Sequence, residues 1–170
     1  MTPRVSIIMG STSDMPVMRA AAEFLAQMEV PYEINALSAH RTPAQVATFA
    51  EEAAPRGIEV VIAAAGGAAH LPGVIAASTI LPVIGVPIRS ANSVNGMDSL
   101  LSIVQMPSGI PVATVAIDGA QNAAILACQI LAVGDGALRE RLAAFKTGLA
   151  SKIEKANADL GAMELPFKTN

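Results

Sequence analysis

Short runs of apolar, often β-branched residues alternate along the chain with Ala-rich stretches, and Gly, Ser, Asp or Pro marks each junction. Runs of this kind, bounded by turn residues, predict strands. The expected strands are Val5 to Met9, Tyr32 to Leu37, Glu59 to Ala65, Pro82 to Val86 and Val112 to Ile117. The first, third and fourth are nearly all apolar, which is typical of parallel strands covered on both faces. The pattern therefore predicts a buried parallel sheet.

Between these strands, apolar residues recur at the spacing of amphipathic helices. The expected helices are Met15 to Met28, Pro43 to Ala54, Pro72 to Ser78, Met97 to Gln105 and Asn122 to Val133. The second of them has the most clearly marked start, because Thr42 predicts a helix cap, Pro43 suits the first helical position and Gln45 completes a capping box.

The regular alternation of strand and helix predicts a single domain, residues 1–170, with a three-layer, doubly wound α/β fold. In folds of this type, ligands bind beyond the carboxyl ends of the parallel strands. Functional residues are therefore expected in the loops that follow the strands.

A last helix is expected at about residues 137–160, after the complete α/β unit. It carries an apolar stripe of Leu138, Leu142, Phe145, Leu149 and Ile153. We interpret it as an arm that packs on a neighbouring subunit. Periodicity alone is equally compatible with packing on its own domain.

Composition strengthens the expectation of self-association. The chain has 170 residues, of which 52% are hydrophobic, 15% charged and 3% aromatic, and its mean hydropathy is +0.50. This is more apolar surface than one small core needs, so either a tightly packed α/β core or burial between subunits is expected, and the low charged fraction favours the second. A net charge of -3, no run of Lys or Arg, one Tyr and no Trp argue against a nucleic-acid polymer as partner. A small substrate is expected instead.

Other classes of protein are disfavoured by local features. The longest apolar region, residues 60–86, is interrupted by several Gly and Pro residues and does not predict a membrane span. The first residues are typical of a strand rather than a secretion signal, so a cytoplasmic protein is expected. Cys128 is the single cysteine and lies in an apolar helical context, so we expect a core residue, no disulfide and no metal site.

Three loops at the ends of predicted strands carry most of the unusual polar residues. In "GSTSD", residues 10–14, Ser11 and Ser13 with the following helix start offer donors suited to a phosphate. Asp14 is an acceptor suited to a ribose hydroxyl. The alternative is that Ser13 or Asp14 only caps the helix. No Gly-Lys-Ser/Thr follows, so the loop is not a Walker A motif and gives no support for ATP binding.

The second loop, "SAHRTP", occupies residues 38–43. Arg41 can make a bidentate contact with a phosphate, and Ser38 adds a hydroxyl. His40 can exchange a proton near neutral pH. The alternative is an exposed polar pair without function, but the position at a strand end, just before a helix start, favours a ligand loop.

In the third loop, "AGGAAHLPG" at residues 65–73, Gly66 and Gly67 let backbone lie close to a ligand, and the alanines keep the wall small. His70 fits either a structural or a functional role. The later segment 90–117 mixes a polar loop with a helix, and spacing alone assigns it no function. Because neither a nucleophile elbow nor a carboxylate pair is present in the loops, one histidine is the expected proton carrier.

With these residues assembled, the sequence resembles the PurE family, specifically the class I enzymes, N5-carboxyaminoimidazole ribonucleotide mutases of purine biosynthesis. The motifs "MGSTSDMPVM", "SAHRTP", "AGGAAHLPG", "GVPIRS", "MDSLLSIVQMPSGIPVATVAI" and "NAAILACQILA" follow the family pattern in order. The resemblance covers roughly residues 4–133. One departure is "AIDGAQNAA", which is shorter than the usual connection after the fifth strand and puts local subunit packing in doubt.

The resemblance implies a flavodoxin-like fold, a homo-octamer with sites at subunit interfaces, and a reaction without metal, ATP or biotin. It implies that Ser11, Asp14 and Arg41 bind the ribose phosphate and that His40 is the acid/base residue. Further positions that match the pocket lining are Ser38, Ala65, Gly66 and Leu71, and His70 matches a family histidine whose role stays open. The remaining alternatives are a class II carboxylase that uses CO2 directly and a nucleotide-binding module without turnover.

Overall fold

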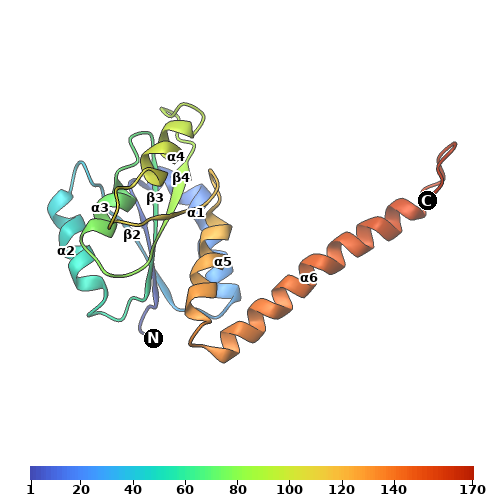
Figure 1. Ribbon diagram of the computed structural model, residues 1–170, viewed down its shortest axis with the longest axis horizontal. Coiled ribbons are helices and arrows are strands. Elements are labelled where there is room, and N and C mark those ends of the chain that lie inside the picture. Colours follow the sequence, from blue (N-terminus) through green and yellow to red (C-terminus); the bar gives the residue numbers. More distant parts are fainter.

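The computed structural model describes residues 1–170 as a parallel five-stranded sheet with helices on both faces (Figure 1). The strand order is β2-β1-β3-β4-β5, which is the flavodoxin-like order. The strands are β1 (Val5–Met9), β2 (Tyr32–Ala36), β3 (Val60–Gly66), β4 (Val83–Ile88) and β5 (Ala113–Thr114). The predicted doubly wound α/β fold is confirmed.

Two hydrophobic clusters form the core, one on each face of the sheet. Because side chains alternate along a strand, Val60, Ile62 and Ala64 of β3 face one cluster, while Val61 and Ala63 face the other. The first cluster packs against α1 (Met15–Gln27) and α5 (Ala120–Leu131), and the second against α2 (Pro43–Ala53), α3 (Leu71–Ala77) and α4 (Met97–Val104). A short 3-10 turn, η1 (Thr12–Asp14), precedes α1.

Three strands are buried along their whole length or nearly so, as their apolar runs predicted. These are β1, β3 and β4, whereas β2 is an edge strand with three exposed residues. The predicted interior position of Cys128 is also confirmed, since the thiol is fully buried and burial raises its pKa to about 11. At neutral pH this thiol stays protonated, and it has the character of a core residue.

The prediction for the fifth strand was too long. Only Ala113 and Thr114 pair with β4, because the chain turns away after Val115. The turn is made by Asp118, which has a left-handed backbone (φ +57°) and donates its N–H to the Pro87 carbonyl at 2.8 Å. Strand β4 runs two residues beyond its predicted end, to Ile88, and so extends the edge of the sheet where the loops gather.

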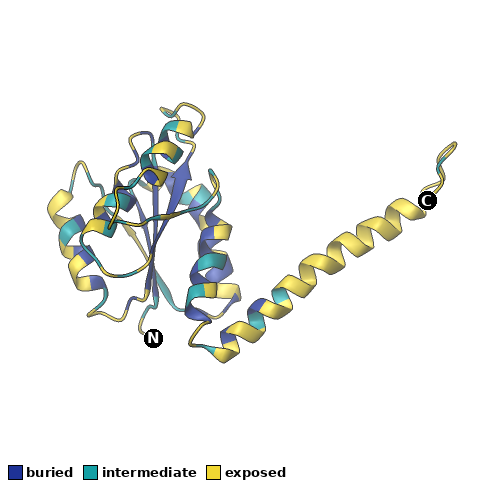
Figure 2. Ribbon diagram, viewed as in Figure 1, coloured by how far each residue is buried: buried dark blue, intermediate teal, exposed yellow.

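The helix α6 (Gly136–Gly161) leaves the domain as a single long arm (Figure 1). Its first turns pack against the chain's own domain. There Leu138 and Leu142 are buried, and the Phe145 ring lies edge-on to Phe24 with ring centroids 4.9 Å apart. Every residue from 146 to 167 is exposed (Figure 2). None of the helices combines the length and apolar character needed to cross a membrane.

Arginines fix the base of this arm. Arg4 pairs with the N-cap Asp135 at 2.8 Å, and the Asp135 carboxylate in turn accepts the Leu138 N–H at 3.0 Å. Arg139 donates to the Ala132 carbonyl at the end of α5, and Arg141 donates to the Met28 carbonyl at the end of α1. Cations at helix carboxyl ends are favourable, so these contacts hold the direction in which α6 departs.

Candidate active site

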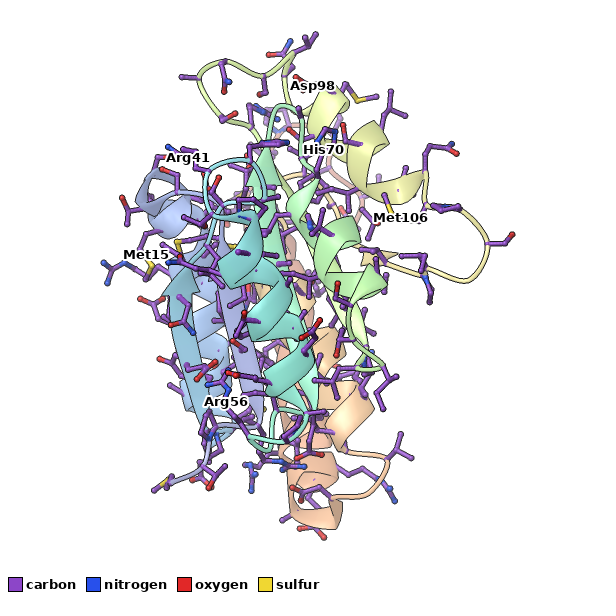
Figure 3. The ribbon with its side chains drawn as sticks, turned by 90° about the vertical axis from the view of Figure 1, so that its left-hand side faces the viewer. Met15, Arg41, Arg56, His70, Asp98 and Met106 are labelled. Carbon is purple, nitrogen blue, oxygen red and sulfur yellow. The ribbon has the colours of Figure 1, made fainter.

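The loops after β1, β2, β3 and β4 meet at one edge of the sheet and enclose a cavity of about 240 Å³. This edge lies beside β1 and β3, where the order of the chain reverses, which is the usual ligand position in such folds. Figure 3 shows Arg41 and His70 together at this end of the sheet, with Arg56 at the opposite end. The lining residues are Gly10, Ser11, Ser13, Asp14, Ser38, Ala39, His40, Arg41, Ala65, Gly66, Ala68, His70, Leu71, Ser90 and Asn92.

Residues 11–14 form a polar cradle in front of α1. The Ser11 hydroxyl oxygen accepts hydrogen bonds from the Ser13 N–H at 3.3 Å and the Ser13 hydroxyl at 3.0 Å, so Ser11 caps the short 3-10 turn. Asp14 precedes α1 but makes no side-chain cap bond. The alternative that Asp14 or Ser13 merely caps the helix is therefore wrong, and the Asp14 carboxylate remains available to the pocket.

The Asp14 carboxyl group is buried, and burial raises its pKa above the ordinary value. Hydrogen bonds from the Ser13 hydroxyl and the Ser11 backbone N–H oppose this rise but are weaker. A buried carboxylate that has no cationic partner is costly to the folded protein. Such an arrangement is typical of a group kept for a ligand that donates hydrogen bonds.

Arg41 crosses from the second loop to the first. Its Nη2 donates to the Gly10 carbonyl at 3.0 Å and its Nε donates to the Ser38 hydroxyl at 3.3 Å. The Ser38 hydroxyl also accepts the Arg41 backbone N–H at 3.2 Å. Two of the five N–H donors of the guanidinium thus hold it in place, and the others can reach an anion beside Ser11.

The expected capping box at the start of α2 is wrong, although Pro43 occupies the first helical position as predicted. The Thr42 side chain makes no cap bond. Instead its hydroxyl accepts the Ser38 N–H at 3.0 Å and donates to the Ser38 carbonyl at 3.1 Å, because the loop turns tightly enough to bring Ser38 within reach. Thr42 therefore closes the loop that presents His40 and Arg41.

The two histidines of the chain contact each other in the pocket. His40 Nε2 and His70 Nδ1 are 2.7 Å apart, and the rings meet edge-on with centroids separated by 4.9 Å. At this distance one nitrogen donates and the other accepts, so the contact holds a single proton. The structure thus brings His70, whose role the sequence left open, into direct contact with the predicted proton carrier.

The far wall of the pocket is formed by the ends of β3 and β4. Gly66 lies so close to Ser90 that a Cβ added to it would be 2.4 Å from the Ser90 hydroxyl oxygen. Gly67, between the lining residues Gly66 and Ala68, is buried and turns the chain with a left-handed backbone (φ +61°). A larger residue at position 66 would displace Ser90 from the wall.

Sequence reasoning missed Ser90 and Asn92, which line the pocket from the loop after β4. The Ser90 hydroxyl donates to the Asn92 side-chain oxygen at 2.8 Å. The available signal was the polar stretch "SANSVNG" directly after a buried strand, and the general rule for strand ends would have included it. The ionisable groups of the lining are Asp14, His40, Arg41 and His70.

Fold and pocket together define a flavodoxin-like α/β protein with a polar pocket, built around a pair of histidines, at the switch point of its sheet. The chain belongs to the AIR carboxylase family, whose model matches residues 4–152. The resemblance to the PurE enzymes is thereby confirmed, and it extends beyond the residues 4–133 on which the sequence motifs rest.

Named relatives are similar to most of the chain. The N5-carboxyaminoimidazole ribonucleotide mutase of Pyrococcus horikoshii is 60% identical over 153 residues, which are 90% of this chain and 86% of that protein. The enzyme of the same name from Mycobacterium leprae is 55% identical, with 93% of this chain and 92% of that protein covered. The phosphoribosylaminoimidazole carboxylase of Schizosaccharomyces pombe is 53% identical over 91% of this chain, which matches 29% of that longer protein.

A solved structure agrees with the fold. The crystal structure of Treponema denticola PurE superposes with a TM-score of 0.80 at 28% sequence identity, covering 93% of this chain and 98% of that chain. The similarity includes nearly all of both chains, so the predicted flavodoxin-like fold with a carboxyl-terminal helix is supported along its length.

Proposed function

We infer that this chain is an N5-carboxyaminoimidazole ribonucleotide mutase, an isomerase of de novo purine biosynthesis. The observation that carries the proposal is a titratable histidine pair in the same pocket as an Arg and Ser cradle suited to phosphate. Relatives of that name at 54–60% identity support the choice of reaction. As the family resemblance implies, no metal, ATP or biotin takes part.

The substrate is held by its ribose phosphate in this proposal. The phosphate lies between Ser11, Ser13 and Arg41, because hydroxyl groups, backbone N–H groups and a guanidinium converge there. The Asp14 carboxylate accepts hydrogen bonds from the ribose hydroxyls. Ser38 keeps the Arg41 side chain in position, and Ala65, Gly66 and Leu71 shape the wall against the imidazole.

His40 then moves one proton through the reaction. It protonates N5 of the substrate, the bond between N5 and the carboxylate carbon breaks with its electron pair going to N5, and CO2 is released. C4 attacks the CO2 that is still in the pocket, and His40 removes the C4 proton to restore the aromatic ring. His40 gives one proton to N5 and takes one proton from C4, so the mutase reaction needs no external acid or base.

The neighbouring groups suit this sequence of steps. His70 Nδ1, 2.7 Å from His40 Nε2, orients the His40 ring and shares its proton. The wall formed by Gly66 and Ala68 is small and carries no nucleophilic side chain. CO2 can therefore remain near C4 without reacting with the protein.

A second candidate function is direct carboxylation of the aminoimidazole ribonucleotide by CO2, which the name of the Schizosaccharomyces pombe relative favours. Incubation of the protein with the N5-carboxylated ribonucleotide, and separately with the uncarboxylated ribonucleotide and bicarbonate, distinguishes the two. We expect rapid formation of the 4-carboxy product only from the first. Efficient use of the second would establish the carboxylase, and binding without conversion of either would leave a nucleotide-binding module.

Removing the charge of Asp14 is expected to weaken binding and to stabilise the fold. Burial raises the pKa of Asp14 in the folded protein, so ionisation of this carboxyl group disfavours folding. The resulting loss of stability begins near the ordinary pKa and grows as pH rises through the raised pKa of the folded state. Asp14→Asn should therefore raise Tm at pH 7, with the difference shrinking toward pH 4. KM should increase by about tenfold to a hundredfold, since a hydrogen bond to a charged group contributes about 1.5–3 kcal/mol. A lower Tm at pH 7 would contradict this account.

We also propose that the protein is a cytoplasmic homo-octamer in which α6 packs on a neighbouring subunit. Supporting this, the stripe buried at Leu138 and Leu142 continues along the exposed part of the helix as Leu149, Ile153 and Leu160. The arginines at the base of α6 hold this stripe away from its own domain, where another copy can cover it.

Charges on the exposed stripe should therefore dissociate the assembly. The double variant Leu149→Asp and Ile153→Asp is expected to give a smaller species, because each buried side chain of this size contributes about 1.5–3 kcal/mol at an interface. Light scattering after size exclusion measures the mass. Ser151→Asp, on the opposite face of the same turns, is the matched control and should leave the mass unchanged. Equal masses for all three proteins would exclude α6 as an assembly arm.

A further inference from the structure

Ser99, in the first turn of α4, is a fully buried serine next to the pocket but not in its lining. Its hydroxyl oxygen accepts the Gly67 N–H at 2.8 Å and donates to the Ile88 carbonyl at 2.9 Å. Gly66 and Ile88 are the last paired residues of β3 and β4. The hydroxyl therefore bridges the two strands one step beyond the point where their direct pairing ends.

This bridge joins the two loops that form the far wall of the pocket. From Gly67 the chain runs through two alanines to His70, and Ile88 is two residues before Ser90. The wall has little slack, because a Cβ on Gly66 would be 2.4 Å from the Ser90 hydroxyl oxygen and 3.3 Å from the Ile88 carbonyl oxygen. A small shift of either strand end thus moves pocket residues directly.

The first turn of α4 also holds the rest of the loop after β4. The Asp98 carboxylate accepts the Val94 N–H at 3.0 Å and the Ser99 N–H at 3.0 Å. Figure 3 places Asp98 and His70 at the same end of the sheet. By contrast, the phosphate side of the pocket is tied together through Arg41, Gly10 and Ser38, without any bond to α4.

We propose that Ser99 is a positioning residue for the reaction, whose hydroxyl spaces the strand ends and so places His70 against His40. Nothing else in the structure bridges the Gly67 N–H and the Ile88 carbonyl. In Ser99→Ala the hydroxyl is absent, so these two buried groups lose their partner, or the strand ends close up and shift the wall. The histidine contact at 2.7 Å leaves no room for such a shift without a change in proton sharing.

Ser6 provides a matched control. It is also a fully buried serine with a hydroxyl that donates a side-chain hydrogen bond, to Glu33 at 2.9 Å, but it lies on β1 away from the pocket lining. Ser6→Ala and Ser99→Ala therefore remove the same group from equally buried sites. If Ser99 were only structural, the two variants would lose stability and keep their turnover alike.

The proposal rests on the mutase activity proposed above, and its test separates the two. With the N5-carboxylated ribonucleotide, Ser99→Ala should lower kcat about tenfold or more while KM changes little, because displacement of a reacting group by a fraction of an ångström is costly. Ser99→Cys, a weaker donor and acceptor, should fall in between. Ser6→Ala should keep the kcat of the unmodified protein. Equal kcat values for Ser6→Ala and Ser99→Ala would overturn the role of Ser99, whereas an inactive unmodified protein would overturn the mutase.

A second measurement tests the role of Ser99 without enzyme turnover. Nitrogen-15 NMR of the two histidine rings reports which ring nitrogens carry protons, and the chain contains only His40 and His70. Both sets of signals should shift in Ser99→Ala and stay in place in Ser6→Ala. Unchanged ring signals in Ser99→Ala would overturn the proposal whatever the activity. Should Ser99→Ala fail to fold, Ser99→Cys compared with Ser6→Cys gives the same two readouts.

Discussion

His40→Asn is expected to lower kcat for the mutase reaction by about a thousandfold, while KM changes little. General acid and base catalysis by one side chain contributes about 10²–10⁴-fold, and here the same histidine serves both halves of the reaction. Asparagine keeps a polar group of similar reach, but it cannot give a proton to N5 or take one from C4. Steady-state rates with the N5-carboxylated ribonucleotide measure the effect.

Binding of the phosphate supplies the control for this variant. Ser11, Asp14 and Arg41 are tied to Gly10, Ser13 and Ser38, and none of their side chains is bonded to His40. Calorimetry should therefore give equal affinities of His40→Asn and the unmodified protein for ribose 5-phosphate. A variant with near-normal kcat would show that another group moves the proton, whereas loss of ribose 5-phosphate binding would show that His40 belongs to the phosphate site.

The site could be foreseen because of one property of parallel sheets. Residues that follow β1, β2 and β3 are distant in sequence, but the carboxyl ends of these strands share an edge. Ser11, Arg41 and His70 therefore had to meet once the strands were correctly placed, and the continuous apolar runs of β1 and β3 placed them. The contact between His40 and His70 also depends on the tight turns at Thr42 and Gly67, whose geometry the sequence pattern does not specify.

Other features of the site and the fold depend on tertiary contacts, which the sequence pattern does not specify. The rule for strand ends could have included Ser90 and Asn92, whereas Ser99 bridges two strand ends that only the folded sheet brings together. Strand β5 is short because the chain turns at Asp118 soon after the two paired residues. The apolar stripe of α6 has the same sequence pattern whether its own domain or a neighbouring subunit covers it, and the exposure of residues 146–167 shows that the helix leaves the domain.

Arg41→Lys is expected to reduce kcat/KM by about a hundredfold, chiefly through KM. The guanidinium uses Nη2 on the Gly10 carbonyl and Nε on the Ser38 hydroxyl, so it is held in place before substrate binds, with other donors left for the phosphate. A lysine keeps the charge, yet its single ammonium group cannot hold the loop and present a planar fork at once. A charged hydrogen bond contributes about 1.5–3 kcal/mol, and the loss of one or more of these corresponds to about a hundredfold.

Ser38→Ala separates positioning from charge at the same site. This variant keeps the guanidinium but removes the hydroxyl that accepts both the Arg41 Nε and its backbone N–H, so KM should rise less than in Arg41→Lys. Ribose 5-phosphate affinity should follow the same order, because the contacts concerned lie on the phosphate side of the pocket. If Arg41→Lys bound ribose 5-phosphate as tightly as the unmodified protein, the phosphate would have to be bound elsewhere. The assignment of Ser11 and Asp14 to the same ligand would then fail with it, since Arg41 is the one Arg or Lys of the pocket lining.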